Sequence, residues 1–443
     1  MPKIDETQKM DERRLARRKR RKKNQLISYL VIFFVLAALI VGGFFGVSYL
    51  NKVMNKIQEE KIEEQETQTT ETVEETETET EEETTTEVIE YTQEDLLNEV
   101  VDSCISEMSL EEKVAGLFIV TPESLTGTDL AVKAGDGTRE ALEKYPVGGI
   151  IYFKQNIKSE SQITEMLANT VSMSRYPVFL AVDEEGGKVA RVQEALKLDK
   201  VDDMQKIGET GDVANAQKAY QTIGEYLCQY GFNLDFAPVA DVLTNEENTT
   251  IGERSFGSDP TVVSQMITTS VTTLKNAGVT PCLKHFPGQG DADGDPHTGL
   301  SVSDRTLDEL RTTELVPFKA GMDAGAQMIM AGHISLPQIT GDNTPASLSK
   351  MMITDVLRGE LAYEGVVITD ALNMSAVTEY YTSDEACVKA LKAGCDMLLM
   401  PEDFVTAYEG VIQAVKDGTI SEERIDDSLA RVYHIKYAGT IDK

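Results

Sequence analysis

The chain has 443 residues, and 75 acidic side chains against 42 basic ones give it a formal net charge of −33. This balance excludes a basic nucleic-acid-binding surface spread over the whole molecule, so we expect no nucleic-acid partner. The length allows one large barrel or two to three ordinary domains. The five cysteines are an odd number without CxxC spacing, which predicts buried free thiols rather than a disulfide framework or a zinc site.

A membrane span is predicted near the N-terminus. Residues 25–50 contain no charged side chain and consist largely of Leu, Val, Ile and Phe, and 26 residues suffice for a helix to cross the hydrocarbon core. The basic tail of residues 1–24 should stay in the cytoplasm, because Arg and Lys flank spans on that side. We therefore expect an uncleaved signal anchor in the cell membrane, with the rest of the chain extracellular. A cleaved signal peptide is the alternative, but no small-residue cleavage site follows the apolar run.

Residues 51–92 are predicted to form a disordered linker. From residue 59 to residue 92 the chain holds 15 Glu and 11 Thr. Such a segment buries little apolar surface and repels itself, so it should stay extended. It would hold the following domain away from the membrane.

Residues 93–443 show the pattern of repeated strand and helix units. Short apolar runs alternate with helix-like stretches of roughly ten to twenty-five residues, which is typical of a parallel sheet. Eight such runs are found, at 116–120, 147–153, 177–183, 233–237, 280–285, 327–332, 365–370 and 396–400. Eight strands with helices between them predict an α/β fold of the (β/α)8 TIM-barrel type, since doubly wound sheets usually have fewer strands.

Polar side chains collect at the ends of these predicted strands. In barrels of this type the chemistry takes place at the carboxyl ends of the strands. The candidates at those ends are Asp183, Asp241, Lys284, His285, His333 and Asp370. Any one of them could simply cap a helix or bind solvent, but the whole set indicates a functional site.

Three motifs supply candidate chemistry. Asp183 and Arg191 flank two glycines in DEEGGKVAR, and a carboxylate with a guanidinium suits the recognition of a polyol. Lys284 and His285 end a predicted strand and precede a loop rich in Pro and Gly, which could close over a ligand. Asp370 follows the buried run VVIT, where a lone carboxylate can act as a nucleophile or bind a metal.

A fourth candidate is an Asp-x-His sequence in the Pro- and Gly-rich loop. Asp295 precedes His297 by two residues and could orient its imidazole as a proton donor, although a simple exposed loop histidine is the alternative. The chain has no HExxH, EF-hand or clustered Cys/His motif that would predict a metal. It also has no GxGxxG after a strand and no GxxxxGK[ST] sequence, so we expect no cofactor.

These motifs resemble those of glycoside hydrolase family 3, and in particular those of its bacterial β-N-acetylhexosaminidases. The marker of that branch is KHFPGHG followed by Asp-Ser-His, and this chain reads KHFPGQGDADGDPH from Lys284 to His297. Further matches in the same order are DEEGGKVAR, GFNLDFAPVADV, IGERSFGSDP, MAGHI and VITDALNM. The resemblance covers roughly residues 98–440.

The resemblance implies a retaining double displacement. It makes Asp370 the nucleophile and places the acid/base on His297, with Asp295 as its partner. It assigns contacts with the terminal sugar to Asp183, Arg191, Arg254, Lys284 and His285. We interpret Asp241 and His333 as supporting residues at strand ends.

The chain departs from the family pattern at two positions. Gln289 stands where KHFPGHG has its second histidine, and it keeps a hydrogen-bonding side chain there. Pro296 replaces the serine of Asp-Ser-His, which fixes φ and removes an N–H, so we expect a stiffer loop. Asp295 and His297 keep their spacing.

The activity implied by the resemblance is removal of terminal β-N-acetylglucosaminyl residues from cell-wall (peptidoglycan) fragments or related oligosaccharides. The Asp-x-His pair, in a chain that ends about where one barrel ends, favours this activity over that of the β-glucosidases of the family. A glycoside phosphorylase would use the same residues, and a catalytically silent glycan-binding barrel is the alternative from another class. The expected partners are an N-acetylglucosamine-containing glycan and the membrane, through residues 25–50.

Overall fold

The computed structural model describes residues 92–441, with side chains up to residue 438. These residues belong to one unit, Glu90–Lys443. The predicted basic tail (1–24), the membrane span (25–50) and the linker (51–92, apart from Thr92) lie outside the described residues. Within residues 92–441, no helix is both long enough and apolar enough to cross a membrane.

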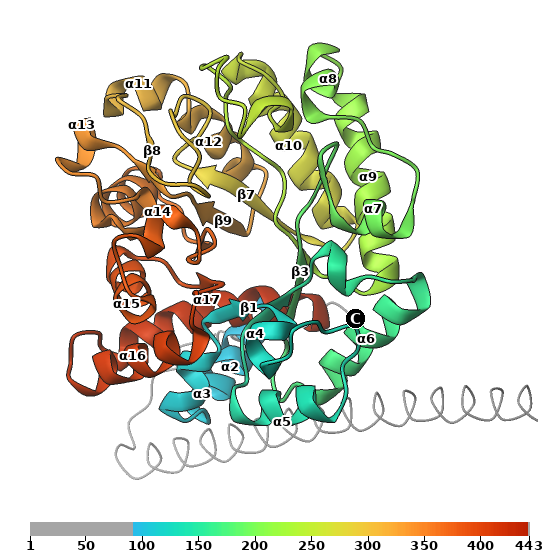
Figure 1. Cartoon of the computed structure of the whole chain (residues 1–443), viewed down its shortest axis with the longest axis vertical. Coiled ribbons are helices and arrows are strands. Elements are labelled where there is room, and N and C mark those ends of the chain that lie inside the picture. Colours follow the sequence, from blue (N-terminus) through green and yellow to red (C-terminus); the bar gives the residue numbers. More distant parts are fainter. Residues whose placement is uncertain (1–91, 442–443) are drawn as a thin grey trace, which may run out of the picture. The chain divides into compact units, whose positions relative to one another are not determined.

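Eight parallel strands form the centre of the unit (Figure 1). They are β1 (Phe118–Val120), β2 (Gly149–Ile151), β3 (Phe179–Val182), β6 (Leu234–Asp235), β7 (Thr280–Phe286), β9 (Met328–Ala331), β11 (Val366–Thr369) and β12 (Leu398–Leu399). Each one falls on one of the eight apolar runs. The order in the sheet is β11-β9-β7-β6-β3-β2-β1-β12, and a parallel bridge between Ile368 and Met397 joins its two edges. The sheet therefore closes, and the predicted (β/α)8 barrel is confirmed.

The side chains of each strand alternate between the barrel interior and the surrounding helices. In β3, Phe179 and Ala181 belong to the interior cluster, whereas Leu180 and Val182 pack in the outer cluster beneath the helices. Both faces of the strand are buried. This is why the strands read in the sequence as continuous apolar runs rather than as alternating ones.

Helices surround the barrel (Figure 1). Those before β6 are α2 (Gln93–Ser106), α3 (Leu110–Ala115), α4 (Pro122–Thr126), α5 (Asp136–Lys144), α6 (Glu160–Met173), α7 (Arg191–Leu196), α8 (Met204–Glu209) and α9 (Val213–Tyr230). Those after β6 are α10 (Pro260–Asn276), α11 (Leu307–Thr312), α12 (Leu315–Asp323), α13 (Pro337–Thr340), α14 (Ser375–Thr378), α15 (Ser383–Ala393), α16 (Phe404–Lys416) and α17 (Glu422–Ile441). The π-helix η4 (Met351–Glu360) precedes β11.

Some short elements are not predicted from the sequence. They are the strands β4 (Glu184–Gly186), β5 (Val189–Ala190), β8 (Ser301–Val302) and β10 (Ile334–Ser335), and the 3-10 turns η1 (Lys154–Asn156), η2 (Gly252–Arg254) and η3 (Ala346–Leu348). The four strands form two separate two-stranded sheets, β4 with β5 and β8 with β10. Both sheets belong to loops that follow barrel strands.

The cysteines agree only in part with the prediction. All five are free thiols, and Cys282, Cys387 and Cys395 are buried as expected. Cys104 is half-buried, and the prediction is wrong for Cys228, which is exposed. Cys228 lies on the outward face of α9, whose inward face is formed by residues such as Leu227.

Helix α17 closes the amino-terminal end of the barrel. Its Val432 packs in the interior cluster, and its Lys436 ammonium lies 4.8 Å from the centre of the Phe179 ring. The buried carboxylate of Asp396, just before β12, accepts a hydrogen bond from Arg431 of the same helix at 3.2 Å. A ligand must therefore enter from the opposite end, at the carboxyl ends of the strands.

Candidate active site

A pocket of about 320 Å³ lies at the carboxyl ends of the barrel strands. Its polar lining consists of Asp183, Glu185, Arg191, Thr250, Arg254, Lys284, His285, Gln289, His297, Asp370 and Asn373. Its apolar lining includes Ile151, Phe153, Val189, Met330, Leu399 and Met400. All the residues predicted for the site line this pocket except Asp295, which lies behind His297. A pocket lined by polar side chains, which we call its polar wall, and also by apolar ones suits a sugar, which carries hydroxyl groups on an otherwise apolar ring.

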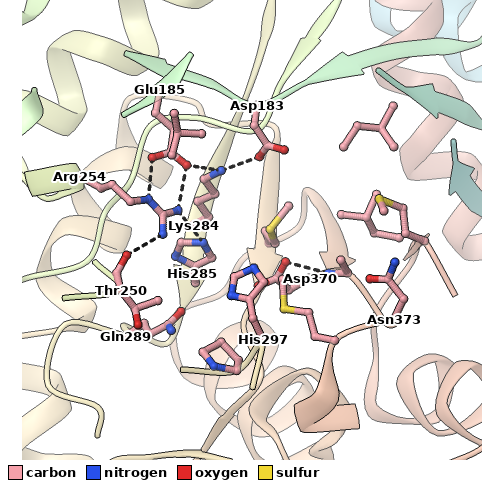
Figure 2. Close-up of a pocket in the computed structure, with 18 of the residues that line it drawn as sticks. Asp183, Glu185, Thr250, Arg254, Lys284, His285, Gln289, His297, Asp370 and Asn373 are labelled. Atoms are coloured by element: carbon pink, nitrogen blue, oxygen red, sulfur yellow. Dashed lines mark hydrogen bonds and ion pairs between the residues drawn. The ribbon is translucent and has the colours of Figure 1, made fainter. Parts of the chain in front are cut away.

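Lys284 is the centre of a buried ion-pair network (Figure 2). Its Nζ atom lies 2.7 Å from Oδ1 of Asp183 and 2.6 Å from Oε1 of Glu185. Glu185 also accepts two hydrogen bonds from Arg254, from Nε at 2.8 Å and from Nη2 at 2.9 Å. Burial raises the pKa of the Glu185 carboxyl, but the two cations outweigh burial and hold that pKa well below its usual range. Glu185 therefore stays ionised at neutral pH.

Lys284 and His285 both line the pocket, although neighbouring residues in a regular strand point to opposite faces. The register between β7 and β9 shifts between Leu283 and Phe286, so the two residues lie in an irregular part of the strand. Irregularities of this kind often turn a side chain toward a neighbouring active site. A cation and an imidazole thus come from consecutive positions of one strand.

His285 is fixed from behind by Asp241. The ring Nδ1 of His285 lies 2.7 Å from Oδ2 of Asp241, and its backbone N–H donates to Oδ1 at 3.2 Å. The ring Nε2 lies 3.3 Å from Nη2 of Arg254. Asp241 is fully buried and does not line the pocket, which agrees with its interpretation as a supporting residue.

Asp370 directly follows β11 and presents a carboxylate to the pocket. Its Oδ1 atom accepts a hydrogen bond from the N–H of Ala371 at 2.7 Å, and the residue is only 6% exposed. Burial raises the pKa of the Asp370 carboxyl, but the imidazoles of His285 and His333, the N–H of Ala371 and the ammonium of Lys284 outweigh burial and hold that pKa below its usual value. The carboxylate is therefore ionised at neutral pH, as a nucleophile must be.

His333 supports this end of the site as a neutral ring. Burial lowers its pKa, so it carries no charge at neutral pH. Its Nδ1 lies 2.7 Å from Oγ of Ser347, and its Nε2 lies 3.0 Å from the carbonyl oxygen of Ala371. These contacts fix the backbone just after Asp370, in line with the supporting role expected of His333.

Asp295 and His297 form a pair on the loop of residues 287–300, which we call the dyad loop. The ring Nδ1 of His297 lies 2.7 Å from Oδ1 of Asp295, which also accepts the backbone N–H of His297 at 3.0 Å. Burial raises the pKa of Asp295, but the bonds from His297 outweigh burial and lower that pKa. Asp295 is therefore an ionised acceptor at Nδ1, which leaves the ring Nε2 of His297 to face a ligand.

The dyad loop is attached at several points. Asp293 exchanges two backbone hydrogen bonds with Val302 in β8, of 2.8 and 2.9 Å. The carbonyl oxygen of Pro296, between the two dyad residues, accepts the N–H of Ala376 in α14 at 3.0 Å. This last bond joins the dyad loop to the segment that follows Asp370. The two halves of the candidate chemistry are thus held together by the backbone.

Arg191 is a cation without a partner in this part of the structure. It lines the pocket as predicted, and its Nε atom is buried with no hydrogen-bond partner among the described residues. No ion pair joins it to a carboxylate of the described chain. Its guanidinium is therefore available to a ligand with oxygen acceptors.

Glu185 is the principal site residue that the sequence analysis missed. It lies two positions after Asp183, and both side chains reach Lys284. In an extended segment, residues two apart point to the same side. The spacing of Asp183 and Glu185 could therefore have predicted that both side chains face the same site. Two further lining residues are not predicted from the sequence, which carries no comparable signal for them. They are Thr250, whose carbonyl oxygen accepts a hydrogen bond from Arg254, and Asn373.

Residues 92–441 contain no group of three or more His, Cys, Asp or Glu side chains that could hold a metal ion. Four charged groups of the pocket are instead paired with one another, namely Asp183, Glu185, Arg254 and Lys284. What they can do without a cofactor is bind hydroxyl groups, supply a carboxylate nucleophile and transfer a proton through an imidazole.

These are the functions required of an enzyme that cleaves a glycosidic bond at the carboxyl end of a barrel. The chain belongs to glycosyl hydrolase family 3, because the model of that family's N-terminal domain matches residues 109–435. The fold and the family implied by the sequence motifs are thereby confirmed.

Named relatives agree with this assignment. The β-hexosaminidase of Stenotrophomonas maltophilia (strain K279a) is 35% identical over 280 residues, which are 62% of this chain and 81% of that protein. The β-hexosaminidase A of Pseudoalteromonas piscicida is 33% identical over 67% of this chain, and the match spans 54% of its own length. This chain therefore spans about half of that relative.

A solved structure shows the same fold. A glycoside hydrolase family 3 β-N-acetylglucosaminidase from Paenibacillus sp. (strain FPU-7) superposes with a TM-score of 0.71 at 33% sequence identity. The superposition covers 76% of this chain and 64% of that one. The superposition and the family match support the same fold.

The ion-pair network yields a first prediction. Glu185→Gln leaves Lys284 with one carboxylate and Arg254 with none, so we expect the free energy of unfolding to fall by about 3 kcal/mol. Asp183→Asn should cost less, because the Asp183 side chain is 18% exposed whereas that of Glu185 is 1% exposed. Urea unfolding of the full chain measures both. A loss in Glu185→Gln no greater than that in Asp183→Asn would contradict this account of the network.

Proposed function

We propose that this chain is a retaining, exo-acting β-N-acetylhexosaminidase. It would remove terminal β-N-acetylglucosaminyl residues from cell-wall fragments or related oligosaccharides. The observation that carries the proposal is the ionised carboxylate of Asp370 in the same pocket as His297, whose ring is held by Asp295. The names of the relatives support the choice of sugar, since both sequence relatives are called β-hexosaminidases.

The first step of the proposed reaction forms a covalent intermediate. Oδ2 of Asp370, the oxygen not held by the N–H of Ala371, attacks the anomeric carbon from one face of the sugar. The glycosidic C–O bond breaks, and Nε2 of His297 donates its proton to the departing oxygen. The ionised Asp295 stabilises the imidazolium before that transfer.

The second step releases the sugar with its configuration retained. The neutral Nε2 of His297 removes a proton from water, and the water oxygen attacks the anomeric carbon. The ester bond to Asp370 breaks, which regenerates its carboxylate. Two inversions at one carbon give net retention.

The polar wall would bind the sugar before these steps. The ion pair of Asp183 and Lys284 can accept from one hydroxyl group and donate to its neighbour, and the unpaired guanidinium of Arg191 can donate to a further oxygen. Helix α17 closes the amino-terminal end of the barrel, so no passage leads from the pocket through the barrel for a second sugar. We infer an exo mode of cleavage from that closure.

The experiment that tests the proposed function compares initial rates of the full chain on an aryl β-N-acetylglucosaminide and an aryl β-glucoside. We expect a preference for the acetamido sugar, and Asp370→Asn should lower kcat by about three orders of magnitude or more, because an amide is a poor nucleophile. A preference for the glucoside would contradict the choice of sugar. Failure of the wild type to cleave either substrate would favour the glycan-binding alternative.

Histidine variants provide the matched control. His297→Ala should lower kcat/KM by about 10²- to 10⁴-fold, with the smallest loss on substrates whose leaving group needs no proton. His434→Ala removes a histidine that pairs with Glu94 outside the pocket and should leave the rate unchanged. Sugar 1-phosphate among the products in phosphate buffer would identify a phosphorylase instead.

We further propose that the enzyme is anchored in the cell membrane by residues 25–50, with the barrel outside the cell. The support is the uncharged apolar stretch and the basic residues before it. Expression of the full chain, followed by membrane sedimentation and protease treatment of intact cells, tests this proposal. We expect the barrel to sediment with the membranes and to be cleaved by protease added to intact cells. A barrel in the soluble fraction, or one protected from the protease, would contradict the proposed anchoring.

A further inference from the structure

Glu184 is a buried acidic residue beside the pocket that the proposed reaction does not use. It lies between Asp183 and Glu185, which both line the pocket, but its own side chain is 0% exposed and does not line it. Neighbouring residues in an extended segment point to opposite sides, which explains why Glu184 faces away from the sugar. Burial of a carboxyl group is destabilising unless hydrogen bonds satisfy it. The partners of Glu184 therefore indicate its role.

The side chain of Glu184 accepts three hydrogen bonds. Its Oε2 atom accepts from the N–H of Val192 at 2.7 Å, and its Oε1 atom accepts from the N–H of Gln193 at 2.9 Å. The same Oε1 accepts from the hydroxyl group of Tyr226 in α9 at 2.6 Å. One carboxyl group thus joins the start of α7 to α9, one of the helices that surround the barrel.

Glu184 takes the place of a helix cap for α7. Val192 and Gln193 are the second and third residues of that helix, and their N–H groups have no acceptor within it. Ala190, which precedes the helix, has no side chain that could accept from them. Because a capping acceptor stabilises the first turn of a helix, the contact with Glu184 fixes the backbone at this point.

The first turn of α7 carries one of the residues that would bind the sugar. Arg191 is the first residue of the helix and directly precedes the two residues that Glu184 holds. Its guanidinium lines the pocket, and its Nε atom is buried with no hydrogen-bond partner among the described residues. The position of this guanidinium therefore depends on the backbone that carries it.

The main chain of Glu184 makes separate contacts. Glu184 pairs with Ala190 in the small sheet of β4 and β5, and its N–H donates to Oδ1 of Asp235 at 2.9 Å. These contacts remain when the Glu184 side chain is replaced. A substitution at this position therefore removes the bonds to α7 and Tyr226 and keeps the backbone contacts of the segment that carries Asp183 and Glu185.

We propose that Glu184 is a positioning residue, which acts through the first turn of α7 to hold the guanidinium of Arg191 at the sugar. This inference rests on the proposed function, in which Arg191 donates to an oxygen of the sugar. A contact that is equally strong in the bound substrate and in the transition state lowers KM and leaves kcat unchanged. Loss of the Glu184 side chain should therefore weaken binding rather than slow the chemical steps.

The test measures kcat and KM of the full chain on an aryl β-N-acetylglucosaminide. Burial raises the pKa of the Glu184 carboxyl to about 7, so assays at about pH 8 keep the wild-type group largely ionised. Glu184→Met, of similar size but without an acceptor oxygen, should raise KM about tenfold and change kcat by less than about twofold. Glu184→Gln keeps one acceptor oxygen and should raise KM only about threefold.

Tyr226→Phe is the matched control. It removes the one hydrogen bond to the Glu184 side chain that does not lead to α7. The buried site loses a bond, but Val192 and Gln193 keep their acceptor, so KM should change by less than about twofold. A rise of KM in Tyr226→Phe as large as that in Glu184→Met would overturn the inference, because any disturbance of the buried site would then have the same effect.

A double-mutant cycle with Arg191→Met separates positioning from a general structural role. Arg191→Met alone should raise KM about tenfold, and the addition of Glu184→Met should raise it by less than about twofold more, since the residue through which Glu184 acts is gone. Multiplied effects in the double variant, or a fall in kcat at unchanged KM in Glu184→Met, would overturn the inference and leave the proposed function intact. If Glu184→Met does not fold, Glu184→Gln enters the same cycle, and an unchanged KM in that variant would then overturn the inference.

A separate measurement covers failure of the proposed function. If the wild type cleaves no acetamido substrate, the proposed function fails, and calorimetric binding of N-acetylglucosamine to the same variants decides the inference. Binding about tenfold weaker in Glu184→Met than in the wild type, with no further loss when Glu184→Met is added to Arg191→Met, would support it. Equal binding in the wild type and Glu184→Met, or no binding to the wild type, would overturn it.

Discussion

The active site depends on the pairing of one buried ammonium group, that of Lys284, with carboxylates. The Lys284 ammonium is buried, and a buried cation is stable only when carboxylates pair with it. Asp183 and Glu185 supply those carboxylates, and Glu185 in turn holds Arg254 by two hydrogen bonds. One buried lysine thereby fixes the polar wall of the pocket before any ligand arrives. Pre-organised polar groups of this kind reduce the free energy needed to bind and orient a sugar.

Asp241 fixes the part of the pocket that contains His285 and Gln289. A single buried carboxylate accepts from the ring and backbone of His285 and from the backbone of Gln289. The contact with His285 fixes an imidazole in the pocket lining, and the contact with Gln289 fixes the start of the dyad loop. The bond from Ala376 to Pro296 then joins the middle of that loop to the segment after Asp370. One connected set of contacts therefore positions both Asp370 and the loop that bears His297.

Much of the fold could be predicted from the sequence because burial on both faces leaves a simple signal. Each barrel strand reads as an apolar run, and the polar residues that follow the runs, such as Asp370 and Lys284, mark the site. The roles of His297 and Arg254 came from resemblance to a family, because spacing alone does not distinguish a proton donor from an exposed loop histidine. Glu185 was missed, since its importance depends on the burial of Lys284, about a hundred positions later. The contact of Glu184 with the start of helix α7 is likewise a three-dimensional property that no local pattern records.

The central claim is that Asp370 forms a covalent bond with the anomeric carbon. The most direct measurement incubates the full chain with a 5-fluoro-N-acetylglucosaminyl fluoride, whose ring fluorine slows hydrolysis of the intermediate, and locates the added mass by peptide mass spectrometry. The account predicts one sugar attached to the peptide that contains Asp370, and none in Asp370→Asn. A sugar attached to another carboxylate, or rapid release of a product of inverted configuration without any adduct, would contradict it.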